Sequence, residues 1–309
     1  MRKFTQNKVA ESRLALPTTI VYAVAVWLLA GLIQGGWWLQ FGCFGFALAA
    51  LLMVELNNIN ALIRIYSRMV SCSFLVLSSM LCFLFPSTPG AITSPLVIGS
   101  MVSLFAGYQD KQATKPSYYA FLLLGLASLA FVHILFFVPL IWLLMAFLLQ
   151  CLSWRTWFAS ILGLLTPYWF GCCWWAWQQD ISFVFNHFMA LGDFARPLDF
   201  SLLTIPQTVS LAVVMLFAVI GIVHYIRKYH DDKIRIRLIY GIFIWTDLAT
   251  ALFLVLQPQH YDHLIRMMVI NTAPLIGHFL ALTRTRWTNM AFFAIVAIVL
   301  ITTGINLWM

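Results

Sequence analysis

Three polar residues fall inside long apolar stretches of the chain, where a polar side chain needs a partner. Asp247 lies in the stretch 237–257, and Asn271 and His278 lie in 267–283. A carboxylate at bilayer depth costs at least about 2.5–3.5 kcal/mol on insertion scales, so Asp247 should be paired, protonated or facing water. Because Asn271 and His278 are seven positions apart, a helix places both on one face. The three residues predict either an intramembrane proton or substrate site, or hydrogen-bonded helix packing.

Acids and histidines also lie in two segments between apolar stretches. The candidates for general acid–base chemistry are Asp180, Asp193, Asp199 and Asp262. His260, Asp262 and His263 form a weak metal-binding candidate, since imidazole and carboxylate both bind zinc or manganese. Their spacing matches no strong metal motif, and the sequence has no Walker loop, GxGxxG, GxSxG or HExxH. It therefore predicts no cofactor and does not identify a reaction.

Arginines next to the apolar stretches are candidates for binding lipid phosphate, because guanidinium N–H groups match phosphate oxygens. These arginines are Arg64, Arg68, Arg196 and Arg266. In residues 57–68, polar side chains recur every three or four positions. This spacing predicts a helix lying in the headgroup plane with its arginines at phosphates. The alternative is a partner or substrate site that involves Glu55 and Arg64.

The composition places all of these residues in a membrane protein. The chain is 62% hydrophobic and only 9% charged, and its mean hydropathy is +0.91. About twenty apolar residues cross a bilayer as a helix, and stretches of that length occur almost end to end. The predicted fold is all-α, a polytopic transmembrane helical bundle.

We predict eleven spans, with one helix in each apolar stretch. The stretches are 15–34, 39–56, 69–86, 91–108, 117–135, 136–152, 157–177, 207–226, 237–257, 267–283 and 289–308. No polar loop divides 117–152. The length of this stretch nevertheless indicates two helices, because about 36 residues would form a helix of ~54 Å, too long for one ordinary crossing. His133 and Pro139 flank the predicted hairpin.

The placement of basic residues orients this topology. With eleven spans and a cytoplasmic N-terminus, 16 of the 18 lysines and arginines fall on the cytoplasmic side, leaving Arg196 and Arg266 outside. This agrees with the positive-inside rule and predicts an external C-terminus. The net charge of +8 then indicates membrane lipids as partners, and not nucleic acid. Membrane-protein partners remain open.

The sequence predicts one integral membrane domain, residues 1–309. The segment 178–206 is the longest predicted external loop and should form one or two short interfacial helices. It separates a seven-span part, 1–177, from a four-span part, 207–309.

The stretch from Arg68 to Trp177 resembles an uncharacterised family of bacterial multi-pass inner-membrane proteins. GLASL and WRTWxxxxLGLLTPYW carry most of this resemblance. The same succession is similar, more distantly, to the membrane core of GT-C glycosyltransferases. That resemblance implies a GT-C-like core and a polyprenyl-phosphate lipid as partner at the external face. GT-C enzymes carry a catalytic acid in the first external loop, whereas the corresponding loop here, GGWWLQ, has none.

Three functions follow as expectations. The first is a non-catalytic or lipid-handling component of envelope biogenesis. The second is a GT-C-like transferase that uses a lipid-linked donor and the external acids. The third is a proton-coupled transporter that uses Asp247 and His278.

Overall fold

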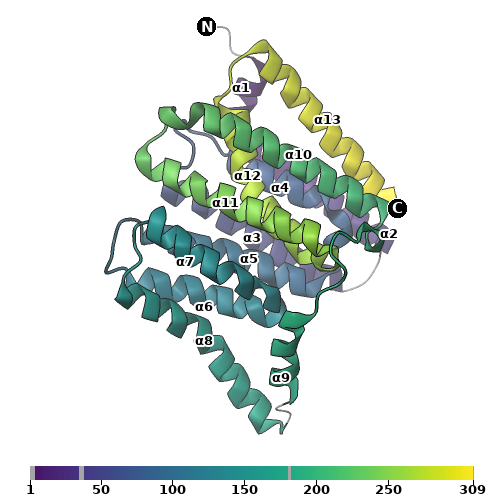
Figure 1. Cartoon of the computed structure of the whole chain (residues 1–309). Coiled ribbons are helices and arrows are strands. Elements are labelled where there is room, and N and C mark those ends of the chain that lie inside the picture. Colours follow the sequence, from purple (N-terminus) through teal and green to yellow (C-terminus); the bar gives the residue numbers. More distant parts are fainter. Residues whose placement is uncertain (1–3, 35–37, 180–181, 309) are drawn as a thin grey trace.

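The computed structural model describes residues 4–34, 38–179 and 182–308, and all regular structure in these ranges is helical (Figure 1). The α helices are α1 (Thr5–Ala10), α2 (Ala15–Gln34), α3 (Trp38–Asn60), α4 (Met69–Met80), α5 (Thr88–Ala106), α6 (Thr114–Ala130), α7 (Phe137–Phe147), α8 (Trp154–Trp177), α9 (Ser182–Met189), α10 (Ile205–Lys228), α11 (Ile234–Leu256), α12 (Tyr261–Leu282) and α13 (Arg286–Trp308). Short 3-10 turns include η1 (Cys82–Leu84), η2 (Val132–Phe136), η3 (Ala190–Gly192), η4 (Phe200–Leu202) and η6 (Pro258–His260). The all-α prediction is confirmed.

Each predicted apolar stretch contains one of these helices, but the helices differ in length and apolarity. Seven are long and apolar enough to cross a membrane: α2, α3, α5, α10, α11, α12 and α13. The other four are α4, α6, α7 and α8, of which α4 has 12 residues and α7 has 11. Length and composition therefore support a multi-pass membrane protein with seven candidate spans.

The predicted division of 117–152 into two helices is confirmed. α6 ends at Ala130, the turn η2 follows, and α7 begins at Phe137. The pair returns to the end of the bundle where it started, because Gln109 N donates to Leu149 O at 2.8 Å. Ser153 Oγ likewise donates to Lys111 O at 2.7 Å.

Contacts between connecting segments define two ends of the bundle. At the end that we call the inner end, Arg64 Nη1 donates to Asp231 O at 3.2 Å, and Gln6 Nε2 of α1 donates to Leu280 O at 2.7 Å. At the opposite, outer end, Gln259 Nε2 donates to Asp193 O at 2.7 Å. The inner end gathers segments predicted to be cytoplasmic, and the outer end gathers segments predicted to be external.

α12 is the central helix of the bundle. In its most apolar stretch 94% of the residues are buried, against 22–50% for the other candidate spans. It packs against α4 and α5 as well as α10 and α11 (Figure 1). One continuous hydrophobic core therefore includes residues from both sides of the 178–206 segment.

The GLASL and LGLLTPYW motifs pack against each other between α6 and α8. A Cβ at Gly163 would lie 2.3 Å from Tyr118 O, and one at Gly125 would lie 2.7 Å from Leu164 O. Ser128 Oγ and Tyr168 OH are hydrogen-bonded at 2.6 Å across the same interface. Small residues that let two backbones approach, together with interhelical hydroxyl bonds, are typical of helix packing in membranes. These motif residues therefore hold α8 against α6.

The prediction of a headgroup helix over 57–68 is wrong. α3 continues to Asn60, Ala61 takes a positive φ of 47°, and residues 61–68 form no helix. Asn60 is buried, and its Oδ1 accepts from Arg235 Nη2 at 2.9 Å. Asn60 thus joins the turn to α11, while Asn57 donates to Ser67 O within the turn and Arg64 donates to Asp231 O in the segment before α11.

The short helices predicted in 178–206 are present in its described part. α9 exposes Phe185, Phe188 and Met189, and η3 and η4 follow it. η3 contacts η2, so the segment lies against the outer end beside α8.

Gly163→Ala should destabilise the α6–α8 interface by about 1–3 kcal/mol, because the added methyl group meets a backbone carbonyl that cannot turn away. Thermal unfolding of the purified protein in detergent measures this as a lower Tm. Gly304→Ala is the matched control, since a Cβ at Gly304 meets no atom within 4 Å. Equal Tm values for the two variants would contradict the described packing.

Candidate functional site

The outer end of α12 collects more of the predicted site residues than any other described part of the chain. η6 ends at His260 and leads directly into α12, whose first turns hold Asp262, His263 and Arg266. Tyr261 OH donates to Gln207 O at 2.9 Å and holds the start of α12 against α10. Asp262 lies in the first turn, where a carboxylate interacts favourably with the helix dipole.

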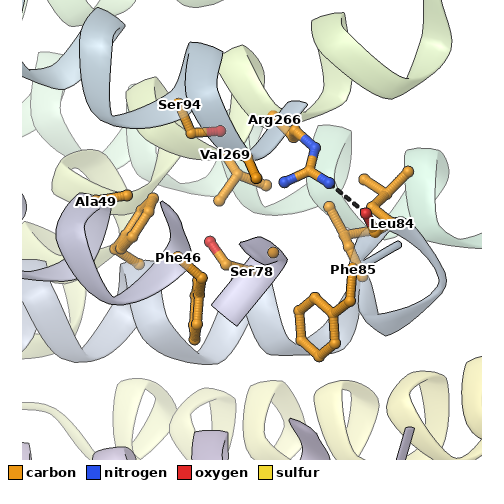
Figure 2. A pocket seen from close by; sticks show the side chains of 12 residues that line it. Phe46, Ala49, Ser78, Leu84, Phe85, Ser94, Arg266 and Val269 are labelled. Carbon is orange, nitrogen blue, oxygen red and sulfur yellow. Dashed lines mark hydrogen bonds between the residues drawn. The ribbon is translucent and has the colours of Figure 1, made fainter. Parts of the chain in front are cut away.

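Arg266 points from α12 into a small cavity between α3, α4 and α5 (Figure 2). The cavity has a volume of about 30 Å³ and is mainly apolar, with Phe46, Phe85 and Val269 among its lining residues. Ser78 and Ser94 provide the hydroxyl groups of this lining. One guanidinium nitrogen, Nη2, donates to Leu84 O of η1, drawn as the dashed line in Figure 2.

The Arg266 guanidinium lacks a carboxylate partner among residues 4–34, 38–179 and 182–308. No carboxylate oxygen there lies within 4 Å of it, and its Nε is buried without a hydrogen-bond partner. A Cβ at Gly90 would lie 2.5 Å from that Nε, so glycine is the residue that leaves room for the guanidinium. Asp262, one helical turn earlier, acts on the guanidinium electrostatically without forming an ion pair within 4 Å. Because a buried charge that lacks a close counterion costs several kcal/mol, this cavity is a candidate site for an anion.

A second and larger cavity, the outer pocket, lies beside the first turn of α12. Its volume is about 460 Å³, and its polar lining residues are His133, His187, Asp193, Gln259, His260, Asp262 and His263. They come from η2, α9, η3, η6 and α12, so the pocket forms only when these segments meet. Asp262 and Arg266 are one helical turn apart, which places the outer pocket next to the Arg266 cavity.

Aromatic stacking holds the imidazole rings of the outer pocket. The His133 and His260 ring centroids are 3.8 Å apart, and His263 stacks on Phe131 at 4.3 Å. His133 is 4% exposed, and its Nε2 has no hydrogen-bond partner among the described residues; the same holds for His263 Nδ1 and His187 Nε2. Burial lowers the pKa of His187, which favours its neutral ring. The pocket thus offers neutral hydrogen-bonding groups and two carboxylates.

The three weak metal candidates do not form a metal centre. His260 Nε2 lies 3.0 Å from Gln259 Nε2, and the His263 ring faces Phe131. In the described ranges no group of three His, Cys, Asp or Glu side chains is arranged to hold a metal ion.

The remaining external candidates are more exposed. Asp193 lines the outer pocket, whereas Arg196 is exposed on the segment that follows. Asp199 accepts hydrogen bonds from Ser201, which lower the pKa of its carboxyl group. Asp180 lies outside the described residues.

Of the two inner-end arginines, Arg64 binds another segment of the protein. Arg64 lies 3.6 Å from the Asp231 carboxylate and bonds to the Asp231 carbonyl. Arg68 is half-buried next to the start of α4. Arg64 therefore has a protein partner where a lipid phosphate was predicted.

The structure places Asp247 and Asn271 at the same helix interface without a hydrogen bond between them, and His278 lies elsewhere. Asp247 accepts from Thr272 Oγ1 at 3.2 Å, and Asn271 Oδ1 accepts from Thr246 Oγ1 at 3.0 Å. Both pairs lie at the α11–α12 interface. His278 shares a helix face with Asn271 but lies about 10 Å further along the axis, too far to share a partner. Its Nε2 lies 2.9 Å from Asp232 Oδ2 instead.

Sequence reasoning missed two of these residues. The sequence indicates His133 only as a residue that flanks the predicted hairpin, and it gives no signal for Asp232. No local pattern distinguishes Asp232 from Asp231, although the first is buried and the second is exposed. The difference arises from the α10–α11 turn, which directs neighbouring side chains to opposite sides.

Comparison of the chain with protein family models, with curated proteins and with solved structures found no match in any of the three.

Proposed function

We propose that this chain is an inner-membrane protein that holds a phosphate-bearing lipid at its external face, as a non-catalytic component of envelope biogenesis. The observation that carries the proposal is the Arg266 guanidinium, a cation turned into an apolar cavity with no carboxylate within 4 Å among the described residues. A phosphate oxygen supplies the missing negative charge and accepts from the free N–H groups.

The proposal includes the finer topology that the sequence predicts. All eleven helices cross the membrane, the N-terminus is cytoplasmic and the C-terminus is external, and the bundle has a GT-C-like core. Arg266 then lies near the external headgroup layer, within reach of lipid phosphates. The short α4 is almost wholly buried inside the bundle. α7 follows directly on η2, so residues 132–147 together form one apolar helical stretch, and a bilayer can adapt locally to a shorter helix.

The cavity also limits which part of the lipid enters. Its volume of about 30 Å³ matches one oxygen-sized group and not a whole headgroup. The rest of the headgroup would lie in the outer pocket, one helical turn away. A polyprenyl phosphate, as the GT-C resemblance implies, is the lipid that we propose.

Arg266→Gln should weaken binding of farnesyl phosphate, a short polyprenyl phosphate, by about tenfold or more. Loss of a charge-assisted hydrogen bond costs about 1.5–3 kcal/mol, and 1.4 kcal/mol corresponds to a factor of ten. Titration of the purified chain in detergent with farnesyl phosphate measures the affinity. Farnesol, which has the same tail without the phosphate, should bind both proteins equally weakly.

Arg196→Gln is the matched control, because this external arginine is exposed and lines neither cavity. It should retain the affinity of the unaltered chain. Equal binding of farnesol and farnesyl phosphate, or unchanged binding by Arg266→Gln, would contradict the proposal.

One observation favours the transferase alternative. Asp193 and Asp262 line the same pocket as four histidines, and a carboxylate beside a neutral imidazole is suited to general acid–base chemistry. A lipid-linked donor with its phosphate at Arg266 would place its sugar near these acids. The transferase alternative therefore uses the same binding site as the lipid-holding function, but it also requires an acidic side chain for catalysis.

Complementation of a deletion strain separates the two functions. If the chain only holds a lipid, Asp193→Asn, Asp199→Asn and Asp262→Asn should each restore envelope integrity, as should Asp180→Asn, while Arg266→Gln should not. Immunoblotting of membranes shows that each variant is present at equal amounts. A well-expressed variant of a single acid that fails to complement would favour the transferase.

A further inference from the structure

A buried cluster of titratable side chains lies at the inner end of α12, far from the proposed lipid site. Its centre is the pair of Asp232, from the turn before α11, and His278, from α12. Nε2 of His278 and Oδ2 of Asp232 are 2.9 Å apart, and each side chain is 1% exposed. The proposed lipid function does not use this pair.

Aromatic rings enclose the pair on two sides. Tyr225 of α10 and Tyr240 of α11 lie with their ring centroids 5.2 and 5.1 Å from that of His278. The two tyrosines stack on each other at 4.5 Å, and His224 of α10 lies 5.4 Å from His278. These rings separate the pair from lipid.

The charged groups around the cluster are engaged elsewhere. On α10, Lys228 lies 3.9 Å from Asp231, and Asp231 also lies 3.6 Å from Arg64 of the 61–68 turn. On α11, the Arg237 guanidinium lies 5.0 Å from the Tyr229 ring centroid, and Arg235 bonds to Asn60.

The neighbouring elements add no cation to the pair. α4 approaches α12 through the backbone of Met69 and Val70 at Gly277. From the first helix, Gln6 bonds to Thr283, and Arg284 lies 3.9 Å from Glu11. Of the residues that the structure describes, none places a lysine or arginine nitrogen within 4 Å of the Asp232 carboxylate. His278 is therefore its counterion.

Polar atoms in the cluster remain without hydrogen bonds. Among the described residues, Asp232 Oδ1, His278 Nδ1, His224 Nε2 and Tyr225 OH are buried and unpartnered. Buried polar groups are nearly always satisfied, and unpaired ones tend to mark a site where a proton, water or ion exchanges.

We propose that Asp232 and His278 form a proton-binding site that opens to the cytoplasmic side. The α10–α11 turn packs on α12 while this site holds its proton and is released when the proton leaves. With one proton on His278 the pair is neutral and fits its apolar surroundings. When the proton leaves, a buried carboxylate remains without a counterion. The turn then moves to bring Asp232 into water. The site thus releases the turn as the proton is lost with rising pH.

Hydrogen–deuterium exchange of the full chain in lipid nanodiscs tests this proposal. Protection factors of peptides that cover residues 229–236, corrected for the intrinsic exchange rate, should fall with rising pH. Because one proton is lost each time the turn opens, the protection factor should change by up to about tenfold per pH unit. Peptides from α6 and α8 should show no such slope.

Asp232→Asn should remove the pH dependence while the turn stays protected, because a neutral amide can bond to a neutral imidazole without an unpaired charge. Asp231→Asn is the control: this neighbour is exposed, and the slope should persist. Because Asp232→Asn could impair folding, His278→Gln provides a second variant, which should leave the turn unprotected at every pH. Protection of the unaltered chain that does not depend on pH, or an unchanged slope in Asp232→Asn, would overturn the proposal.

Discussion

The polar side chains of α12 have few partners open to them, because this helix is surrounded by other helices along nearly its whole length. Almost all of its residues are buried, so bulk water does not satisfy them, and most of them bond to neighbouring segments of the protein. Arg266 reaches a carbonyl of η1, Asn271 and Thr272 reach α11, and His278 reaches the turn before α11. These bonds join α12 to particular neighbours, whereas apolar packing alone allows many helix rotations.

The two ends of α12 satisfy this constraint differently. At the inner end an acid and a histidine meet, and their charges can cancel within the protein. At the outer end the guanidinium has one carbonyl and no acid within 4 Å in the described ranges. The inner pair thus supplies both charges from the chain itself. At the outer end Asp262 acts on Arg266 only from beyond 4 Å, and our proposal is that an anion from outside the chain completes the charge balance. This asymmetry is the basis for assigning a lipid phosphate to one end and a proton to the other.

Much of the fold could be predicted from the sequence, because apolar length and charge placement are local properties. The eleven apolar stretches and the hairpin at 117–152 follow from them. The contacts that polar side chains make with distant parts of the chain could not be predicted in the same way. The stripe around Asn57 and Asn60 has helical spacing, but Asn60 bonds to Arg235, from a distant part of the chain, and Asn57 bonds to Ser67 of the following turn. The Arg266 cavity depends on Gly90, which in the sequence is only one glycine beside a proline, and Asp232 is identical in type to its exposed neighbour.

The central claim is that the Arg266 guanidinium binds an anion that the chain does not itself supply. An electron cryomicroscopy structure of the full chain in nanodiscs of extracted membrane lipids, at a resolution that shows headgroups, tests this most directly. The account predicts phosphate density in contact with the guanidinium at the outer end, continuous with a lipid tail. A guanidinium paired with a carboxylate of the chain itself, such as Asp180 or a reoriented Asp262, would contradict it.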